Sequence, residues 1–477
     1  MTGAETYDKL RDIIGNVFDG TDYYSGNNEI YVGKILVKAE TADDETEIRA
    51  GTIAIATRAF QGASNLTKLV IPDSVVSIGD EAFYGCNGLL EVTIPNSVVS
   101  IGKSAFAACT KLQKLNIDTV NSALSEIGDK AFLNDKALEK LSLPYNLKKV
   151  GASAFSGCQG LTAITFDGYN EEGEISASSL LEEIGDAAFT GDINLTGISI
   201  PDNVKVIEAS TFEGCSSLES VNFSRNSKLK EIKDSAFAKC VKLGSKITTV
   251  DEDGNKINFP KLTTVKMPNN LVSVGASAFE ECSGMWGIEF QANLASLGAN
   301  VFKGCTNLAK ISIYRATAPA IEATTFFGDG EQNSRTYKLR IYVRADANDL
   351  VKNAYILKWS DVFTDCADYI YDVNEVPVVR FTSVDTDGNL TGEEKFVEAD
   401  CILNPVQSFS SGNTTTWYYY SAKDGSETIN YVHLKDGKTI KVEDYGNQSL
   451  GTASNDYVLV VDYDEMTLVQ AAIERTN

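Results

Sequence analysis

The sequence predicts a repeat solenoid followed by a small all-β domain, and three observations favour this fold class. A phenylalanine, most often in an Ala-Phe pair, returns along most of the chain at intervals close to 23 residues. A short run of alternating apolar residues recurs upstream of the pair, and a proline often ends that run. The repeat then vanishes after Val376, where Thr, Tyr and Val become frequent.

The repeated phenylalanine measures the period. Its spacings are 23, 23, 26, 23, 34, 23, 25, 42, 23 and 24 residues, so insertions interrupt a unit of 23. A period of about 20 to 29 residues with leucine-like positions is typical of leucine-rich repeats. Units this small bury their apolar faces only by stacking. We therefore expect a solenoid whose coils are marked by Phe60, Phe83, Phe106, Phe132, Phe155, Phe189, Phe212, Phe237, Phe279, Phe302 and Phe326.

The unit LTKLVIPDSVVSIGDEAFYGCNGL, residues 66–89, shows how one coil is built. Leu69 and Ile71 recur with a period of two, which suits a short strand with one buried face. Pro72 ends that strand because it has no amide hydrogen to donate to a ladder. Each coil thus supplies one strand to a parallel sheet on the concave face of the solenoid.

Seven cysteines occupy one repeat position, three residues after the phenylalanine. A metal ligand, a redox pair or a nucleophile would not tolerate exchange at that position, whereas a small buried group bonded to turn backbone would. We expect structural thiols. Cys366 and Cys401 lie outside the array, and sequence leaves their pairing open. The seven are Cys86, Cys109, Cys158, Cys215, Cys240, Cys282 and Cys305, and other units hold Ala63, Asp135, Asp192 and Asp329 instead.

The pattern LxxIxIPxxVxxIGxxAFxxCxxL resembles the treponemal-type leucine-rich repeat of BspA-like bacterial surface proteins. The resemblance runs from about Ile48 to Val343, and Ile30–Glu40 is similar to the entry segment of that family. It implies a secreted or surface-anchored, non-enzymatic protein of a host-associated bacterium, used for adhesion or macromolecular binding. The opening residues MTGAETYDKL carry no secretory signal, so an extracellular or cell-surface location implies a leader already removed.

The ends of the array need apolar covers. A helix between Tyr7 and Phe18 is expected to cap the first coil. A second helix, Asn348 to Trp359, with Asp346 as its cap and with Leu350, Val351 and Ala354 on one face, is expected to close the array near Val343. The predicted parts are residues 1–47, the N-terminal cap and entry segment; 48–343, a solenoid of about 11 repeats; 344–375, the C-terminal helical cap; and 376–477, a small β domain of sandwich or β-grasp type.

Three segments outside the regular coil carry their own patterns. Asp167–Ser179 reads as an acidic loop, and Ile247–Phe259 as a hairpin that turns at Asp253 and Gly254. Its DEDGN string lacks the glycine and glutamate positions of a calcium loop. In the last domain, Asp-Gly turns separate three alternating runs and predict a β-meander. The rings of Trp417–Tyr420 within it are either core residues or a sugar-stacking platform.

Charge and composition exclude several functions. The chain has 66 acidic against 42 basic residues and a formal net charge of -24, which disfavours nucleic acids and anionic membranes. No apolar run reaches membrane-spanning length. His433, the only histidine, lies mid-strand in the predicted meander, so nothing in the sequence indicates a catalytic triad, and a His-rich metal site is impossible. We expect no enzymatic activity, no cofactor and no metal.

Candidate binding residues come from the solvent-facing positions of the concave strands. Lys68, Lys114 and Lys140 predict a basic stripe that steers an acidic or sialylated host or microbial protein or glycoprotein; the alternative is a solvated ladder that limits self-association. Trp286 is either an exposed hot spot or coil-edge packing. The main hypothesis is a monomeric binding protein; the alternatives are a spacer that projects the last domain, or an intracellular recognition protein. Further candidates on the same face are Lys310, Arg340 and Tyr342.

Overall fold

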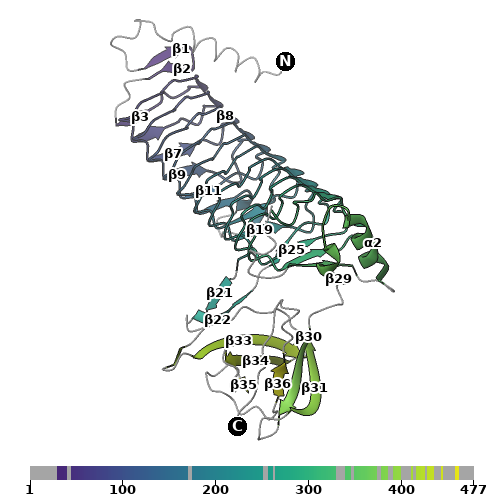
Figure 1. Cartoon of the computed structure of the whole chain (residues 1–477). Coiled ribbons are helices and arrows are strands. Elements are labelled where there is room, and N and C mark those ends of the chain that lie inside the picture. Colours follow the sequence, from purple (N-terminus) through teal and green to yellow (C-terminus); the bar gives the residue numbers. More distant parts are fainter. Residues whose placement is uncertain are drawn as a thin grey trace.

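The protein is a parallel β-solenoid, which confirms the predicted fold class. Figure 1 shows its stacked coils running from β1 (Ile30–Val32) to α2 (Leu350–Trp359). In most coils, a strand of two or more residues pairs in parallel with the strand of the next coil. The computed structural model describes residues 29–39, 44–169, 175–245, 247–250, 256–261, 264–328, 339–344 and 349–372, and the backbone of seven strands between residues 378 and 460.

The longer strands make the front sheet, which is the sheet predicted to be concave. It has three segments because neighbouring strands are not paired at two places along the solenoid. The first segment contains β3 (Glu45–Glu47), β5 (Lys68–Val70), β7 (Glu91–Ile94), β9 (Lys114–Ile117), β11 (Lys140–Ser142) and β13 (Ala163–Thr165). The second contains β17 (Gly197–Ile200) and β19 (Ser220–Phe223), and the third β23 (Thr264–Lys266), β25 (Gly287–Phe290), β27 (Lys310–Ile313), β28 (Arg340–Val343) and β29 (Ile370–Asp372).

Shorter strands make the back sheet on the other side of each coil. The hairpin of β1 and β2 (Ile35–Lys38) opens it, and β2 then pairs in parallel with the first coil. These strands keep one inward apolar side chain each. They are β4 (Ala54–Ile55), β6 (Ser77–Ile78), β8 (Ser100–Ile101), β10 (Glu126–Ile127), β12 (Lys149–Val150) and β16 (Glu183–Ile184), and, after a break, β18 (Val206–Ile207), β20 (Glu231–Ile232), β24 (Ser273–Val274) and β26 (Ser296–Leu297).

A column of phenylalanine rings fills the interior between the sheets. Successive rings from Phe60 to Phe326 lie 4.8 to 6.2 Å apart between centroids, with planes inclined by 2° to 16°. The two longest units do not interrupt it, since Phe155 and Phe189 are 5.6 Å apart and Phe237 and Phe279 are 5.5 Å apart. Insertions therefore leave the coil without changing the stacking of the core.

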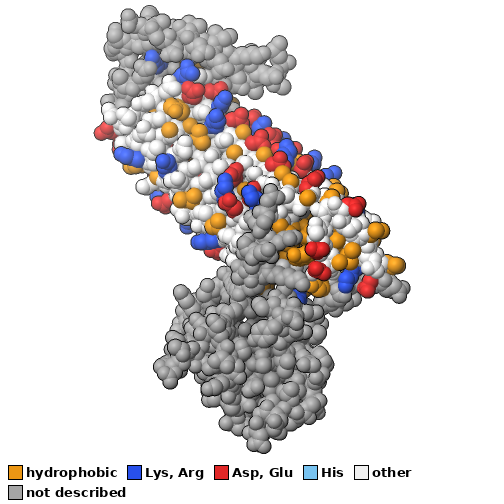
Figure 2. Space-filling model, viewed as in Figure 1, with side chains coloured by type: hydrophobic (Ala, Val, Ile, Leu, Met, Phe, Trp, Pro, Cys, Tyr) orange, Lys and Arg blue, Asp and Glu red, His pale blue; other side chains and the backbone are white. Residues whose placement is uncertain are grey.

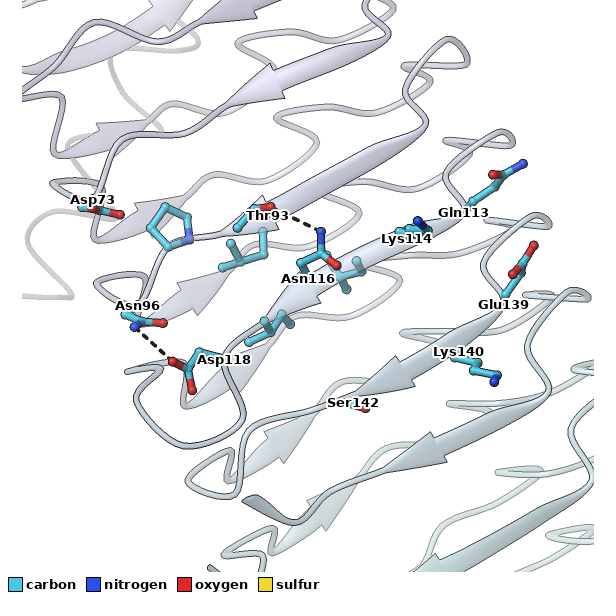
Figure 3. A pocket seen from close by; sticks show the side chains of 14 residues that line it. Asp73, Thr93, Asn96, Gln113, Lys114, Asn116, Asp118, Glu139, Lys140 and Ser142 are labelled. Atoms are coloured by element: carbon cyan, nitrogen blue, oxygen red, sulfur yellow. Dashed lines mark hydrogen bonds between the residues drawn. The ribbon is translucent and has the colours of Figure 1, made fainter. Parts of the chain in front are cut away.

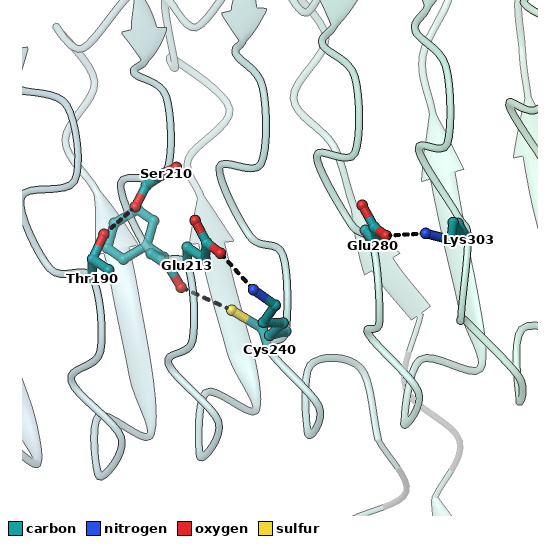
Figure 4. Close-up of polar contacts among 8 residues, drawn as sticks. Thr190, Ser210, Glu213, Cys240, Glu280 and Lys303 are labelled. Carbon is teal, nitrogen blue, oxygen red and sulfur yellow. Dashed lines mark hydrogen bonds and ion pairs between the residues drawn. The ribbon is translucent and has the colours of Figure 1, made fainter. Parts of the chain in front are cut away.

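The cysteine position has the structural role expected of it. Each of the seven thiols is buried and donates to the carbonyl oxygen of the phenylalanine in the preceding coil, at 3.0 to 3.2 Å. Figure 4 shows the bond from Cys240 and, on nearby coils, the ion pair of Glu280 with Lys303 at 2.7 Å. Burial raises the pKa of the Cys158 and Cys282 thiols, so they are poor nucleophiles.

Two aspartates replace cysteine in this column. Asp135 and Asp192 are fully buried and lie in the coils on either side of Cys158. Oδ1 of Asp135 accepts the Cys109 amide at 2.8 Å, while its Oδ2 has no hydrogen-bond partner among the described residues. Burial raises the pKa of both carboxyls well above the usual value, and the neighbouring amides offset this only in part. These coils therefore favour neutral carboxylic acids.

The backbone of each coil passes twice through the left-handed region. In the ten coils from Phe60 to Phe302, the residues two before and two after the phenylalanine have positive φ. Glycine fills the second place in most coils, as Gly85 does at φ 72°. Ala108 holds that place at φ 61°, where a Cβ is unfavourable.

Helix α2 closes the last coil, as predicted, but through other residues. Tyr355 and Trp359 are its buried side chains, and Leu350, expected beside Val351 and Ala354, is 64% exposed. Nε1 of Trp359 donates to the Pro319 carbonyl at 2.9 Å, and its ring lies 5.5 Å from that of Phe326, at the end of the phenylalanine column. The helix begins at Leu350, two residues later than expected, and Cys366 beyond it is a buried free thiol. The predicted N-terminal helix and Cys401 lie outside the described residues.

The second insertion and the last domain have the expected backbones, but the first insertion, predicted as an acidic loop over Asp167–Ser179, contains a short hairpin instead. β14 (Gly168–Tyr169) pairs with β15 (Ile175–Ala177), and β21 (Ile247–Val250) with β22 (Lys256–Lys261), both antiparallel. The predicted turn at Asp253 lies outside the described residues. In the last domain, antiparallel pairing of β33, β34 and β35 confirms the meander. The strands of its sheet are β30 (Val378–Val384), β31 (Leu390–Glu398), β32 (Ser410–Ser411), β33 (Thr415–Asp424), β34 (Glu427–Leu434), β35 (Val442–Glu443) and β36 (Tyr457–Val460).

At the left-handed position two residues after the phenylalanine, changing alanine to glycine and changing glycine to alanine should have opposite effects on stability. We expect Ala108→Gly to raise the free energy of unfolding by about 1 kcal/mol, because glycine adopts positive φ without steric cost. Gly85→Ala should lower it by a similar amount; an added Cβ there meets no atom within 4 Å, so only the backbone is affected. Urea unfolding followed by circular dichroism measures both. Equal midpoints for the two variants would contradict this account.

Removing the two buried acids should stabilise the solenoid at neutral and alkaline pH. The folded pKa of Asp135 and Asp192 exceeds the unfolded value of about 3.9, so wild-type stability falls as pH rises above about 4 toward the folded pKa. We expect Asp135→Asn with Asp192→Asn to gain about 1 to 3 kcal/mol at pH 8 and little at pH 4. Unfolding midpoints across this range test the sign, with exposed Glu182→Gln as the control. A gain that grows toward acid pH would oppose the prediction.

Candidate binding site on the front sheet

The three lysines of the predicted stripe lie on the front sheet and are exposed. Strand β5 shows the reason, because Leu69 is buried between exposed Lys68 and Val70. Backbone register places Lys68 opposite Glu91 and Lys114 opposite Lys140. The charged row across the first segment of the sheet therefore reads Glu45, Lys68, Glu91, Lys114, Lys140.

This row alternates in sign at its start, so the basic stripe is shorter than predicted. Nζ of Lys68 lies 3.6 Å from Oε2 of Glu45, and both side chains are largely exposed. Glu91 then separates Lys68 from Lys114. Figure 2 likewise shows basic and acidic side chains interspersed on the visible face of the solenoid. Within the described part of the chain, neither Lys114 nor Lys140 forms an ion pair, and these two like charges face one another directly, which is unfavourable.

The two strands that carry these lysines diverge. Strand β9 pairs with β7 at four residue positions, and β11 pairs with β13 at three, but β9 and β11 share only the pair Lys114 and Lys140. The coil between Phe106 and Phe132 has 26 residues instead of 23, and the loop after β9 lies within it. The three additional residues of this unit are therefore accommodated after the pair of Lys114 and Lys140, in the loop that follows β9.

Asp118 organises this loop. Its Oδ1 accepts the amides of Val120 at 2.9 Å and Asn121 at 2.8 Å, and its Oδ2 accepts the Asn121 side chain at 2.9 Å. A longer bond of 3.5 Å comes from Nδ2 of Asn96 in the preceding coil. These hydrogen bonds, of which that from the Asn121 amide is the largest, lower the pKa of Asp118 to about 2. The exposed carboxyl is therefore ionised at any physiological pH.

A groove of about 790 Å³ lies where β9 and β11 diverge, and we call it the β9–β11 groove. Figure 3 shows Lys114 and Lys140 at the starts of the strands and Asp73 and Asp118 on the opposite side. Polar side chains lie between these ends, among them Asn116, whose Nδ2 donates to Oε1 of Glu91 at 2.6 Å. No aromatic ring is among the described residues that line the groove, which also include Thr93, Asn96, Gln113, Glu139 and Ser142.

The candidate residues nearer the C-terminal end of the solenoid are mostly buried. Trp286 packs at the edge of its coil and is not an exposed hot spot, since only 6% of the residue is exposed. The expectation that Arg340 and Tyr342 face solvent is wrong; they are 7% and 8% exposed. The Tyr371 ring on β29 covers them, because its centroid lies 6.0 Å from that of Tyr342 and 5.2 Å from the Arg340 guanidinium. Lys310 remains exposed, with Nζ 5.3 Å from the Tyr342 ring.

A second, smaller groove of about 420 Å³ lies at the unpaired junction of β19 and β23. Asn222 and Phe223 line one side, and Thr264 and Lys266 the other. The unit that begins at Phe237 is the longest, with 42 residues, and contains the hairpin of β21 and β22. The irregular repeat lengths in the sequence located the insertions. The two grooves also lie in units of irregular length, but the sequence did not predict them.

Stacked coils of about 23 residues, a phenylalanine column and parallel strands on both sides define a leucine-rich repeat solenoid. The family model of the BspA type leucine-rich repeat region matches in six copies, over residues 53–177, 166–258 and 255–328. These matches cover more than half of the chain. The protein belongs to the BspA type leucine-rich repeat family, which confirms the resemblance seen in the repeat pattern.

Solved structures of bacterial leucine-rich repeat proteins are similar to this chain. A leucine-rich cell surface protein from Faecalibacterium prausnitzii has 24% identity and a TM-score of 0.41, with 71% of this chain and 96% of that chain covered. A leucine-rich repeat protein from Bacteroides ovatus has 18% identity and a TM-score of 0.39, with 72% and 97% covered. The pneumococcal vaccine antigen PcpA has 18% identity and a TM-score of 0.40, with 72% and 87% covered. No curated protein matches the chain.

Among the described residues, no three His, Cys, Asp or Glu side chains are grouped so that they could hold a metal ion. In the same part of the chain, no helix has the length and apolar character needed to cross a bilayer.

The Asp118 carboxyl should titrate far below an ordinary aspartate. We expect a midpoint at about pH 2 in the folded protein, because the Asn121 and Val120 donors stabilise the charged form. Carbon NMR of selectively labelled aspartate measures this value. Asn121→Ala removes the side-chain donor and should raise the midpoint, while Asn87→Ala, an exposed change in an earlier coil, should not. A wild-type midpoint near 4 would show that the loop does not hold the carboxylate.

Proposed function

We propose that the protein is a non-catalytic binding protein of the bacterial surface or of the secreted fraction, acting as a monomer. It engages an acidic region of a host or microbial surface protein or glycoprotein through the front sheet. The observation that carries the proposal is the pair of Lys114 and Lys140, two exposed cations without ion-pair partners in the described chain, at the edge of the β9–β11 groove.

An anionic partner would relieve the repulsion between these lysines. Each exposed charge pair contributes only about 0.2 to 1 kcal/mol, so the two lysines supply orientation and encounter rate more than affinity. The rest of the affinity must come from polar contacts in the groove and from neighbouring front strands. Membership of a leucine-rich repeat family supports this assignment, because stacked coils offer an extended surface of the kind that repeat proteins use for binding.

Reversing the two lysine charges should abolish capture of an acidic partner. We expect Lys114→Glu with Lys140→Glu to reduce recovery of extracellular or mucosal glycoproteins from host extracts about tenfold or more, as measured by pull-down and mass spectrometry. Lys205→Glu with Lys230→Glu, two exposed positions beside the back strands, is the matched control because it changes net charge equally. Both variants should keep the wild-type circular dichroism spectrum.

Other outcomes of the same experiment would identify other functions. Partners retained by the Lys114 and Lys140 variant would indicate a spacer whose last domain binds, and a chain ending at residue 375 would then recover none of them. Partners found only in bacterial cytosol would indicate an intracellular recognition protein. Either result would reject binding of a surface molecule by the front sheet.

A further inference from the structure

We infer that the β9–β11 groove binds an extended polypeptide segment that carries one acidic and one basic side chain about four residues apart. This inference rests on the proposed function, which assigns binding to the front sheet, and it adds the chemical class of the ligand. The juxtaposition that carries it is a groove with opposite charges at its two ends.

The charges at the two ends are those of exposed side chains. At the strand starts, the lining residues Lys114 and Lys140 outweigh Glu139 by one positive charge. Glu91, opposite Lys114 on β7, does not line the groove, and Nδ2 of Asn116 donates to its carboxylate. At the strand ends, Asp73 and Asp118 leave two negative charges. Asp118 cannot be neutralised by ordinary changes of pH, because its loop hydrogen bonds hold it in the charged form.

A ligand of a single charge sign fits only one end. A purely acidic segment that reached across the groove would place a carboxylate against Asp118, and a purely basic one would place an amine against Lys140. Asp118 lies four positions after Lys114, directly beyond the end of β9, a distance of about 13 Å at strand spacing. An extended ligand spans that distance with the same number of residues, so its two charged side chains would meet the two ends together.

The middle of the groove suits a peptide backbone. Thr93, Asn116 and Ser142 present hydroxyl and amide groups that both donate and accept, as the alternating N–H and C=O groups of an extended chain require. Nδ2 of Asn116 is 3.4 Å from Oγ1 of Thr93, a long bond that a ligand carbonyl can replace. The absence of aromatic rings among the described lining residues disfavours a neutral sugar, which binds by stacking on such rings. The volume of about 790 Å³ holds a few residues.

Labelled peptides of equal length test the inference by fluorescence anisotropy with the full chain. One peptide carries Asp and Lys four residues apart in an uncharged, β-prone sequence; the others carry two Asp, two Lys, or neighbouring Asp and Lys. We expect the spaced dipolar peptide to bind at least about fivefold more tightly than each of the others, and to lose that advantage in high salt.

Variants at each end separate this inference from the proposed function. Asp73→Asn with Asp118→Asn keeps side-chain shape and should weaken the dipolar peptide about fivefold; Asp361→Asn with Asp365→Asn, beyond α2, is the matched control. Lys114→Glu with Lys140→Glu should shift the preference to the peptide with two Lys. Tighter binding of the doubly acidic peptide, or no effect of the Asp73 and Asp118 change, would overturn the inference while leaving lysine-dependent capture intact. Loss of lysine dependence in the extract would reject the proposed function itself.

Discussion

The register between successive coils depends on the interior column formed by phenylalanine and by the residue three positions later. Each ring stacks on the next, and each cysteine thiol donates to the backbone carbonyl of the phenylalanine in the preceding coil. Removing a buried ring of this kind costs about 3 to 5 kcal/mol, far more than any single surface contact in the coil. The column therefore keeps one spacing whatever the length of the unit. Extra residues have to leave the coil where the constraint is weaker, at the sheets and the connecting loops.

This division explains where the front sheet departs from regularity. The unit with three additional residues retains its ring contacts at 5.3 and 5.1 Å, yet β9 and β11 keep only one paired position. The longest unit behaves in the same way, with intact rings and an unpaired junction between β19 and β23. The two grooves described above lie at these places. Because the interior is rigid, extra residues in a unit change the surface and not the core. The candidate site accordingly lies in a unit of irregular length.

Features that repeat could be predicted from the sequence, and features that depend on single partners could not. The exchange of Cys with Asp135 and Asp192 correctly identified a structural position, because one repeated environment was sampled many times. The reason for the glycine that follows isoleucine in the repeat pattern is visible only in the structure; a Cβ on Gly102 would lie 2.6 Å from the Gly79 carbonyl carbon, so the stacked backbones require glycine. The burial of Arg340 depends on Tyr371 on β29, which lies beyond the last repeat and leaves no periodic signal. The 26-residue spacing marks an irregular unit, but the divergence of β9 from β11 within it depends on three-dimensional pairing and could not be predicted.

The net charge of the chain constrains which partners can use such a site. At physiological ionic strength, fields from exposed charges decay over about 8 Å, so the overall charge of -24 opposes an anionic partner mainly during approach. Inside the groove the nearby charges matter more: Lys114 and Lys140 favour an anion at the strand starts, and Asp73 and Asp118 favour a cation at the strand ends. A segment with one charge of each sign has no net charge and therefore meets little repulsion as it approaches. It gains from both ends once it is aligned, so selectivity arises from the order of charges along the segment rather than from its total charge.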